Sequence, residues 1–135
     1  MTSFEGDTGP YLQYAHARIC SIIRKAEVNY DQLVHADLSL LTEDHARDLV
    51  RLLSQWPDVF QQTFKTQEPV TTLTYLFRLA HVLSGSIDHL NVIKSETQLK
   101  LARLVLYACV KQVLYSGMTL LGLTPVERYV IHNLH

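Results

Sequence analysis

Residues 4–26 read FEGDTGPYLQYAHARICSIIRKA, a polar, glycine-containing opening followed by a regularly spaced apolar pattern. At the helical spacing of about 100° per residue, six apolar side chains of this stretch fall within one sector roughly 100° wide. They are Leu12, Ala15, Ile19, Ile22, Ile23 and Ala26. Thr8-Gly9-Pro10 is typical of a helix start, because a proline at the first helical position has no N–H to leave unpaired. The stretch therefore predicts a helix from Tyr11 to about Ala26 that buries one face.

Further helices are predicted in the middle of the chain. Thr42 can cap a helix whose apolar stripe consists of Leu49, Leu52, Leu53 and Trp56. Pro57 and Pro69 each predict a new helical start, because proline lacks the N–H that a helix interior requires. A short helix is therefore expected between the two prolines. The helix after Pro69 has its own apolar stripe, formed by Leu73, Leu76, Phe77, Ala80 and Leu83.

The last long helix is predicted from Ser95-Glu96-Thr97 to about Leu121, where Gly122 occupies a position that commonly ends helices. Five or six helical segments with hardly any two-residue alternation indicate an all-α helical bundle. A length of 135 residues, 47% of them hydrophobic, indicates one domain over residues 1–135. Residues 1–10 would form its opening segment and residues 129–135 its tail.

Composition and charge exclude several classes of protein. Twelve basic and thirteen acidic residues leave a formal charge of −1, so any contact with nucleic acid must be local. Two cysteines far apart in the sequence favour a reducing, cytoplasmic location. The most apolar run, residues 101–123, contains Arg103, Lys111 and Gln112, which a bilayer interior would disfavour. No membrane association is therefore expected.

Motifs for catalysis and metal binding are weak in this sequence. None of the seven histidines forms H-E-x-x-H or a cluster with cysteine at ligand spacing, so no metal is expected. Cys20 has no recognisable catalytic framework around it. Tyr11, Tyr14, Arg18 and Lys25 line one strip of the first helix and combine rings with cations, as single-stranded RNA binding requires. The same strip is also typical of a half-buried helix flank.

Four segments carry a family resemblance. The motif FEGDTGPYLQYAHAR closely resembles the stretch that joins the catalytic part of arginyl-tRNA synthetases to their helical anticodon-binding domain, often called the DALR domain. Three further segments agree in the same order: RLLSQWPDVF, EPVTTLTYLFRLAHVLS and ARLVLYACVKQVLYSGMTLLGLTPVER. The likeness extends to about Arg128 and is closest to eukaryotic, especially fungal, members. It implies an all-α bundle of the class I synthetase anticodon-binding type, with the opening segment packing under the first helix.

The resemblance also implies which residues contact RNA. Tyr14 matches a family tyrosine at the anticodon loop, and Arg18 and Arg24 match family arginines on the same helix. We therefore expect these three residues to bind the anticodon loop of arginine tRNA. Tyr11 and Gln13 also match the motif, but they can serve packing.

Three positions depart from the family pattern. Ile87 stands where the family usually has a tyrosine, and Asn91 stands where at least some fungal members have a tryptophan. Such rings would stack on anticodon bases, and each stack is worth roughly 1–3 kcal/mol. Ile87 also continues the apolar stripe of its helix, so packing alone can account for it. Tyr129 replaces a terminal methionine of the family; it can supply a substitute ring, and the residues after it can equally obstruct the site.

Two roles remain open on the sequence alone. The ATP-binding signatures of the HIGH and KMSKS type are absent, so ATP and arginine would bind a separate catalytic domain and this chain would need no cofactor. The first role is recognition of the arginine tRNA anticodon stem-loop, as part of an arginine–tRNA ligase or a protein derived from one. The second is a diverged stand-alone domain with weakened RNA binding that acts through a protein partner. Met1 just before the motif and the altered positions favour this second role more than an ordinary excised domain would, but family membership ranks the tRNA role first.

Overall fold

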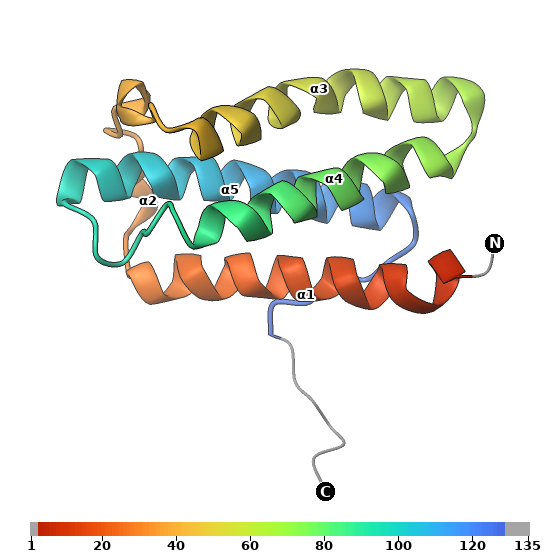
Figure 1. The fold of residues 1–135 in the computed structure, drawn as a ribbon, viewed down its shortest axis with the longest axis horizontal. Coiled ribbons are helices and arrows are strands. Elements are labelled where there is room, and N and C mark those ends of the chain that lie inside the picture. The colour runs from red at the N-terminus through yellow and green to blue at the C-terminus, as the bar shows by residue number, and fades with distance from the viewer. Residues whose placement is uncertain (1–2, 129–135) are drawn as a thin grey trace, which may run out of the picture.

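The computed structural model describes residues 3–128, and these residues form an all-α bundle, as the sequence predicts. In chain order the elements are α1 (Ser3–Ala26), α2 (Tyr30–Leu33), the 3₁₀ helix η1 (Leu38–Leu40), α3 (Asp44–Thr66), α4 (Pro69–Ile87) and α5 (Thr97–Leu120). Figure 1 shows the long helices α1, α3, α4 and α5 lying alongside one another, with α5 behind α4 and α1 at the lower edge. No strand occurs within this described range. None of its helices is both long and apolar enough to cross a membrane.

Helix α1 buries the face that the apolar spacing predicts. Leu12, Ala15, Ile19 and Ala26 are buried, and Ile22 and Ile23 pack against the core from its edge. The helix begins at Ser3, however, and Pro10 lies inside it, so the prediction of a start at Tyr11 is wrong. Residues 3–10 continue the helix instead of forming a separate segment beneath it. Proline has a helical φ and removes one hydrogen bond from the helix, and burial of Leu12, two residues after Pro10, helps to offset that loss.

Helix α3 differs from its prediction in the same way. It runs from Asp44 to Thr66 through Pro57, so no separate short helix starts at this proline. Leu49 and Leu52 before Pro57 and Thr63 after it are all buried, so both halves of the helix pack against the bundle. That packing keeps the helix continuous despite the missing N–H. The N-cap is Glu43 rather than the predicted Thr42.

Helix α4 begins, and helix α5 begins and ends, close to where the sequence predicts. Pro69 is the first residue of α4, and the Glu96 side chain caps α5 by accepting from the backbone N–H groups of Gln98 and Leu99. Gly122 has a φ of 80° directly after α5. The Leu123 N–H donates to the carbonyl of Met118 at 2.8 Å, which completes the usual glycine-terminated helix end.

The core lies between α1, α3, α4 and α5, and its largest fully buried side chains come from all four helices. They include Leu12, Ile19, Leu49, Leu76, Leu79, Leu83, Tyr107 and Leu114. Gly117 of α5 allows α4 and α5 to approach closely, because a Cβ at this position would lie 2.7 Å from Cδ2 of Leu76 on α4. This core holds α1 in a fixed orientation and determines which of its residues face solvent.

Candidate nucleic-acid interface

A pocket of about 380 Å³ lies on the solvent side of α1, and it contains all three residues expected to bind RNA. Helix α1 contributes Tyr14, Ala17, Arg18, Ser21 and Arg24, whose spacing of three or four residues places them on one helix face. Glu127 and Arg128 complete the pocket from the segment that follows α5. Residues more than 100 positions apart in the sequence therefore form one site.

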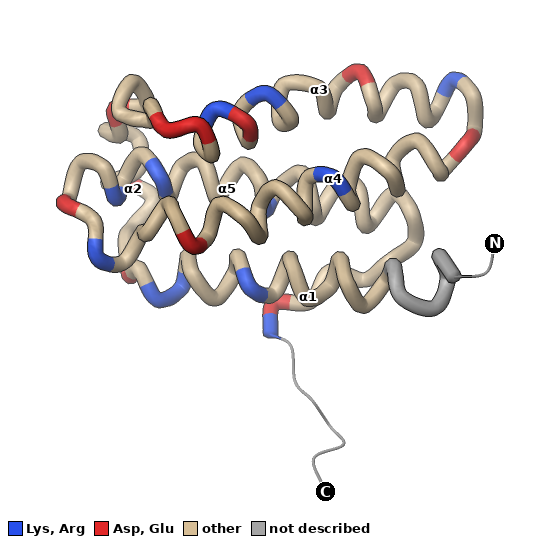
Figure 2. Tube along the Cα trace, in the orientation of Figure 1, with Lys and Arg blue, Asp and Glu red and all other residues tan. Residues whose placement is uncertain are grey.

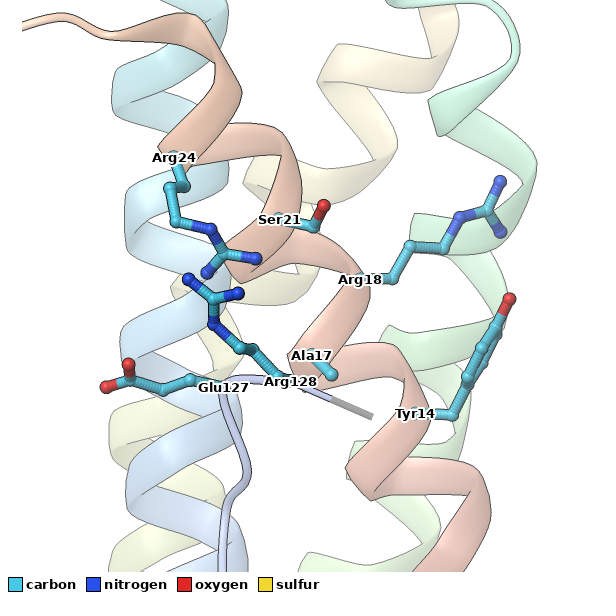
Figure 3. A pocket seen from close by; sticks show the side chains of 7 residues that line it. All are labelled: Tyr14, Ala17, Arg18, Ser21, Arg24, Glu127 and Arg128. Carbon is cyan, nitrogen blue, oxygen red and sulfur yellow. The ribbon is translucent and has the colours of Figure 1, made fainter. Parts of the chain in front are cut away.

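The side chains divide the pocket into two parts. Figure 3 shows Tyr14 and Arg18 side by side on one flank, with the phenol and the guanidinium pointing the same way. On the other flank the guanidinium groups of Arg24 and Arg128 point toward one another, while the Glu127 carboxylate points away. Tyr14 is 50% exposed, so part of the residue faces solvent at this flank. A ring beside cations is the combination that holds single-stranded nucleic acid.

Several positive charges lie on this side of the molecule, and others lie along the remaining helices (Figure 2). Figure 2 shows basic positions along the second half of α1 and at the end of the described chain. The ion pairs among the described residues are Arg51 with Asp48 and Arg103 with Glu43, both away from the pocket. The basic side chains of α1 are therefore not neutralised by ion pairs with this part of the protein.

Two side chains of α1 fix the segment that carries Arg128. The Gln13 Nε2 donates to the Thr124 carbonyl at 3.0 Å, and the His16 Nδ1 lies 2.7 Å from the Val126 carbonyl. A carbonyl oxygen only accepts, so the His16 Nδ1 carries the proton and donates. His16 is 1% exposed, which makes it a buried anchor on α1. Local sequence patterns do not predict this role, because the bond joins residues 110 positions apart.

Tyr11 lies outside the pocket. Its ring centroid is 5.3 Å from that of Phe77 on α4, and 36% of the residue is exposed. This is the geometry of a half-buried helix flank, with the ring packed on a neighbouring helix.

Ile87 and Asn91, the two altered positions, have structural roles of their own and do not line the pocket. Ile87 at the end of α4 packs against the core, in keeping with its place in the apolar stripe. Asn91 is exposed, and its Oδ1 accepts from the Lys94 backbone N–H at 2.9 Å. Its carbonyl also accepts from the buried Arg103 guanidinium at 2.6 Å. Tyr129, the third altered position, lies outside the described residues.

Among the residues that the structure describes, no three His, Cys, Asp or Glu side chains lie close enough together to bind a metal ion. His45 and His89 stack with ring centroids 4.1 Å apart, but the His89 Nδ1 is already 3.0 Å from the Gly85 carbonyl. The pocket on α1 is therefore the part of the described surface where the expected functional residues meet.

Comparison with known proteins assigns this chain to a family. The sequence model of the DALR anticodon binding domain matches residues 12–129. Over 128 residues the chain is 56% identical to a probable cytoplasmic arginine–tRNA ligase of Schizosaccharomyces pombe. It is 54% identical over 129 residues to the cytoplasmic arginine–tRNA ligase of Saccharomyces cerevisiae. Each match covers 95% of this chain and 21% of the relative, so the chain spans about a fifth of these proteins.

Solved structures agree with the sequence matches. Arginyl-tRNA synthetase of Thermus thermophilus superposes with a TM-score of 0.83 at 31% identity, over 93% of this chain and 22% of that one. The Plasmodium falciparum enzyme superposes with a TM-score of 0.75 at 27% identity, over the same shares. The match of fold, and of sequence over most of the chain, shows that this protein belongs to the DALR anticodon binding domain family.

Proposed function

We propose that this chain binds the anticodon stem-loop of arginine tRNA, as the anticodon-binding part of an arginyl-tRNA synthetase. The observation that carries this proposal is the pocket on α1, which gathers Tyr14, Arg18, Arg24 and Arg128 at one solvent-facing site. With a formal charge of −1, the chain lacks a general attraction for RNA, so binding depends on this local cluster. Similarity to arginine–tRNA ligases supports arginine tRNA as the partner in this proposal.

The roles of the side chains follow from their chemistry. The half-exposed Tyr14 ring offers a face on which an unpaired base stacks, and the adjacent Arg18 binds a phosphate or a base edge. Arg24 supplies a further cation across the pocket. We expect these side chains to contact the bases of the loop and not those of the stem. The base edges of a paired RNA stem lie in a deep groove that side chains cannot reach, whereas the bases of a splayed loop are accessible.

In this proposal, catalysis takes place in another part of the synthetase. We propose that ATP and arginine bind the catalytic part of a synthetase and that this chain needs no cofactor. Two of the relatives named above are described as cytoplasmic, and on that basis we place this protein in the cytoplasm. The comparisons give no support to the alternative of a protein-interaction module.

A binding titration with matched arginine variants tests the proposal. The chain is titrated with the anticodon stem-loop of arginine tRNA and with a stem-loop of altered anticodon, each at two salt concentrations. We expect Arg18→Ala and Arg24→Ala each to weaken binding and to lower the salt dependence by about one counterion. Arg51→Ala on α3 removes the same charge away from the pocket and should leave affinity unchanged. Equal affinity for both stem-loops, or no response to Arg18→Ala and Arg24→Ala, would contradict the proposal.

A further inference from the structure

We propose that Arg24 and Arg128 form a phosphate-binding pair within the pocket, and that His16 positions Arg128 for it through the backbone of Val126. The inference rests on the proposed function and deepens it, since it assigns the RNA backbone to one flank of the pocket and a base to the other. His16 is a positioning residue in this arrangement, because it lies beneath the surface and acts through the chain that it holds.

The guanidinium groups of Arg24 and Arg128 point toward each other across one flank of the pocket (Figure 3). Arg24 and Arg128 line the same pocket and their side chains converge, although two like charges at close range repel. Neither is in an ion pair with another described residue, and the neighbouring Glu127 carboxylate points away from them. An anion placed between the groups would turn the repulsion into two attractions. An anionic ligand would therefore stabilise the two guanidinium groups in this arrangement.

A phosphodiester is the anion that fits this flank. Each guanidinium presents a planar fork of donors that matches two oxygens of a phosphate group. The opposite flank presents the Tyr14 ring, whose chemistry suits a base. A nucleotide can therefore extend across the pocket with its base on the Tyr14 side and a phosphate on the Arg24 side.

The position of Arg128 depends on α1 as well as on its own segment. Arg128 follows Val126 by two residues, and the Val126 carbonyl is held at 2.7 Å by the buried His16. Gln13 adds a second bond, to the Thr124 carbonyl at 3.0 Å. His16 and Arg24 belong to the same helix, so the anchor and the partner of Arg128 form one rigid unit. Loss of the anchor would release Arg128 without moving Arg24.

A double-mutant cycle with the anticodon stem-loop of arginine tRNA tests the pair. We expect Arg24→Ala and Arg128→Ala each to weaken binding by roughly tenfold, because each removes charge-assisted hydrogen bonds. The double variant should lose clearly less than the product of the two effects, since both arginines hold one phosphate. Multiplicative losses would show that the two side chains act independently, and would overturn the pair.

The role of His16 is tested by its dependence on Arg128. His16→Leu removes the donor and should weaken RNA binding when Arg128 is present, but not in the Arg128→Ala background. His16→Asn places an amide N–H near the position of Nδ1 and should preserve affinity. Gln13→Ala removes the second bond from a half-buried site and should act in the same direction if His16→Leu fails to fold. A loss that persists in the Arg128→Ala background would overturn the positioning role.

Titration with inorganic phosphate separates this inference from the proposed function. The side-chain Nε–H resonances of Arg24 and Arg128 are followed by NMR, with Arg51 as the control arginine. We expect phosphate to shift both pocket arginines together, and His16→Leu to abolish the Arg128 response alone. If the stem-loop does not bind but phosphate still shifts both resonances, the pair holds and the proposed RNA function fails. If the stem-loop binds and phosphate shifts neither resonance, the pair is wrong.

Discussion

The two cysteine thiols have opposite environments. Cys20 of α1 is buried beside His16, with its Sγ 3.7 Å from Nδ1, and burial raises the pKa of its thiol. Cys109 of α5 is exposed. Because the thiolate is the reactive form, we expect a water-soluble maleimide at pH 7 to label Cys109 at least tenfold faster than Cys20. Mass spectrometry of the timed reaction measures both rates. Equal rates in the folded protein would contradict the burial of Cys20.

Tyr75 makes stability depend on pH in the alkaline range. Its hydroxyl donates to the Leu52 carbonyl at 2.5 Å, and burial raises its pKa from 10 to about 12. Between these values the unfolded chain loses the proton first, so rising pH favours unfolding. Relative to Tyr75→Phe, the native free energy of unfolding should fall by about 1.4 kcal/mol per pH unit from pH 10 to 12. Urea unfolding of both proteins across this range measures the difference. A constant difference would show that Tyr75 does not titrate differently in the folded state.

The altered positions Ile87 and Asn91 can be returned to aromatic residues. Combined Ile87→Tyr and Asn91→Trp should raise affinity for the arginine anticodon stem-loop, because each stacked base contributes roughly 1–3 kcal/mol. Asn91→Ala removes the bond to the Lys94 N–H without adding a ring, so it controls for disturbance of the loop. Affinity is measured by fluorescence anisotropy. Unchanged affinity in the double variant would indicate that this surface no longer takes part in stacking.

At the scale of the helices, the contact between α4 and α5 depends on one glycine. A Cβ at Gly117 would lie 2.7 and 2.8 Å from the two methyl carbons of Leu76 and 3.0 Å from its Cγ, and Leu76 is fully buried. We expect Gly117→Ala to lower the free energy of unfolding by about 1–2 kcal/mol, because overpacking outweighs the gain in helix propensity. Gly85→Ala in α4 is the matched control. A Cβ there meets nothing within 4 Å, so the change should stabilise by about 0.5–1 kcal/mol. Chemical denaturation measures both, and stabilisation by Gly117→Ala would contradict the close packing.

The helix boundaries show how packing overrides local signals. Pro57 predicts a break, yet α3 continues through it because buried residues on both sides of it hold the two halves against the bundle. Tyr75 of α4 supports the same region, since its hydroxyl reaches the Leu52 carbonyl and its ring stacks on Trp56 at 5.6 Å. A proline in the sequence indicates that one backbone N–H donor is missing. It does not indicate which contacts with a neighbouring helix compensate for that loss.

At the scale of the whole molecule, Arg103 of α5 forms hydrogen bonds with two other parts of the chain. From α5 its guanidinium donates to the Asn91 carbonyl at 2.6 Å, to Ser95 Oγ at 2.8 Å and to the Glu43 carboxylate at 2.7 Å. These partners belong to the loop between α4 and α5 and to the start of α3. The Arg103 side chain is 8% exposed, so the network lies largely within the protein. It fixes the ends of three helices with respect to one another.

Removal of this guanidinium should be costly. We expect Arg103→Met to lower the free energy of unfolding by about 1–3 kcal/mol, because the Asn91 carbonyl and Ser95 lose their partner. Water can reach the Glu43 side chain, which is 43% exposed, and this limits the loss. Arg51→Met breaks the exposed pair with Asp48 and should change stability by less than about 1 kcal/mol. Equal losses in the two variants, measured by urea denaturation, would contradict the structural role of Arg103.

The sequence by itself determined the helical class, the buried face of α1, the Gly122 helix end and the family, because these depend on local spacing and on short motifs. It also placed Tyr14, Arg18 and Arg24 on one helix. Only the tertiary structure decided that Pro10 and Pro57 lie inside helices, that Tyr11 packs on Phe77, and that Arg128 meets Arg24. These features depend on contacts between residues far apart in the sequence, such as His16 with Val126. The spacing of residues within one helix does not encode which distant segment packs against it.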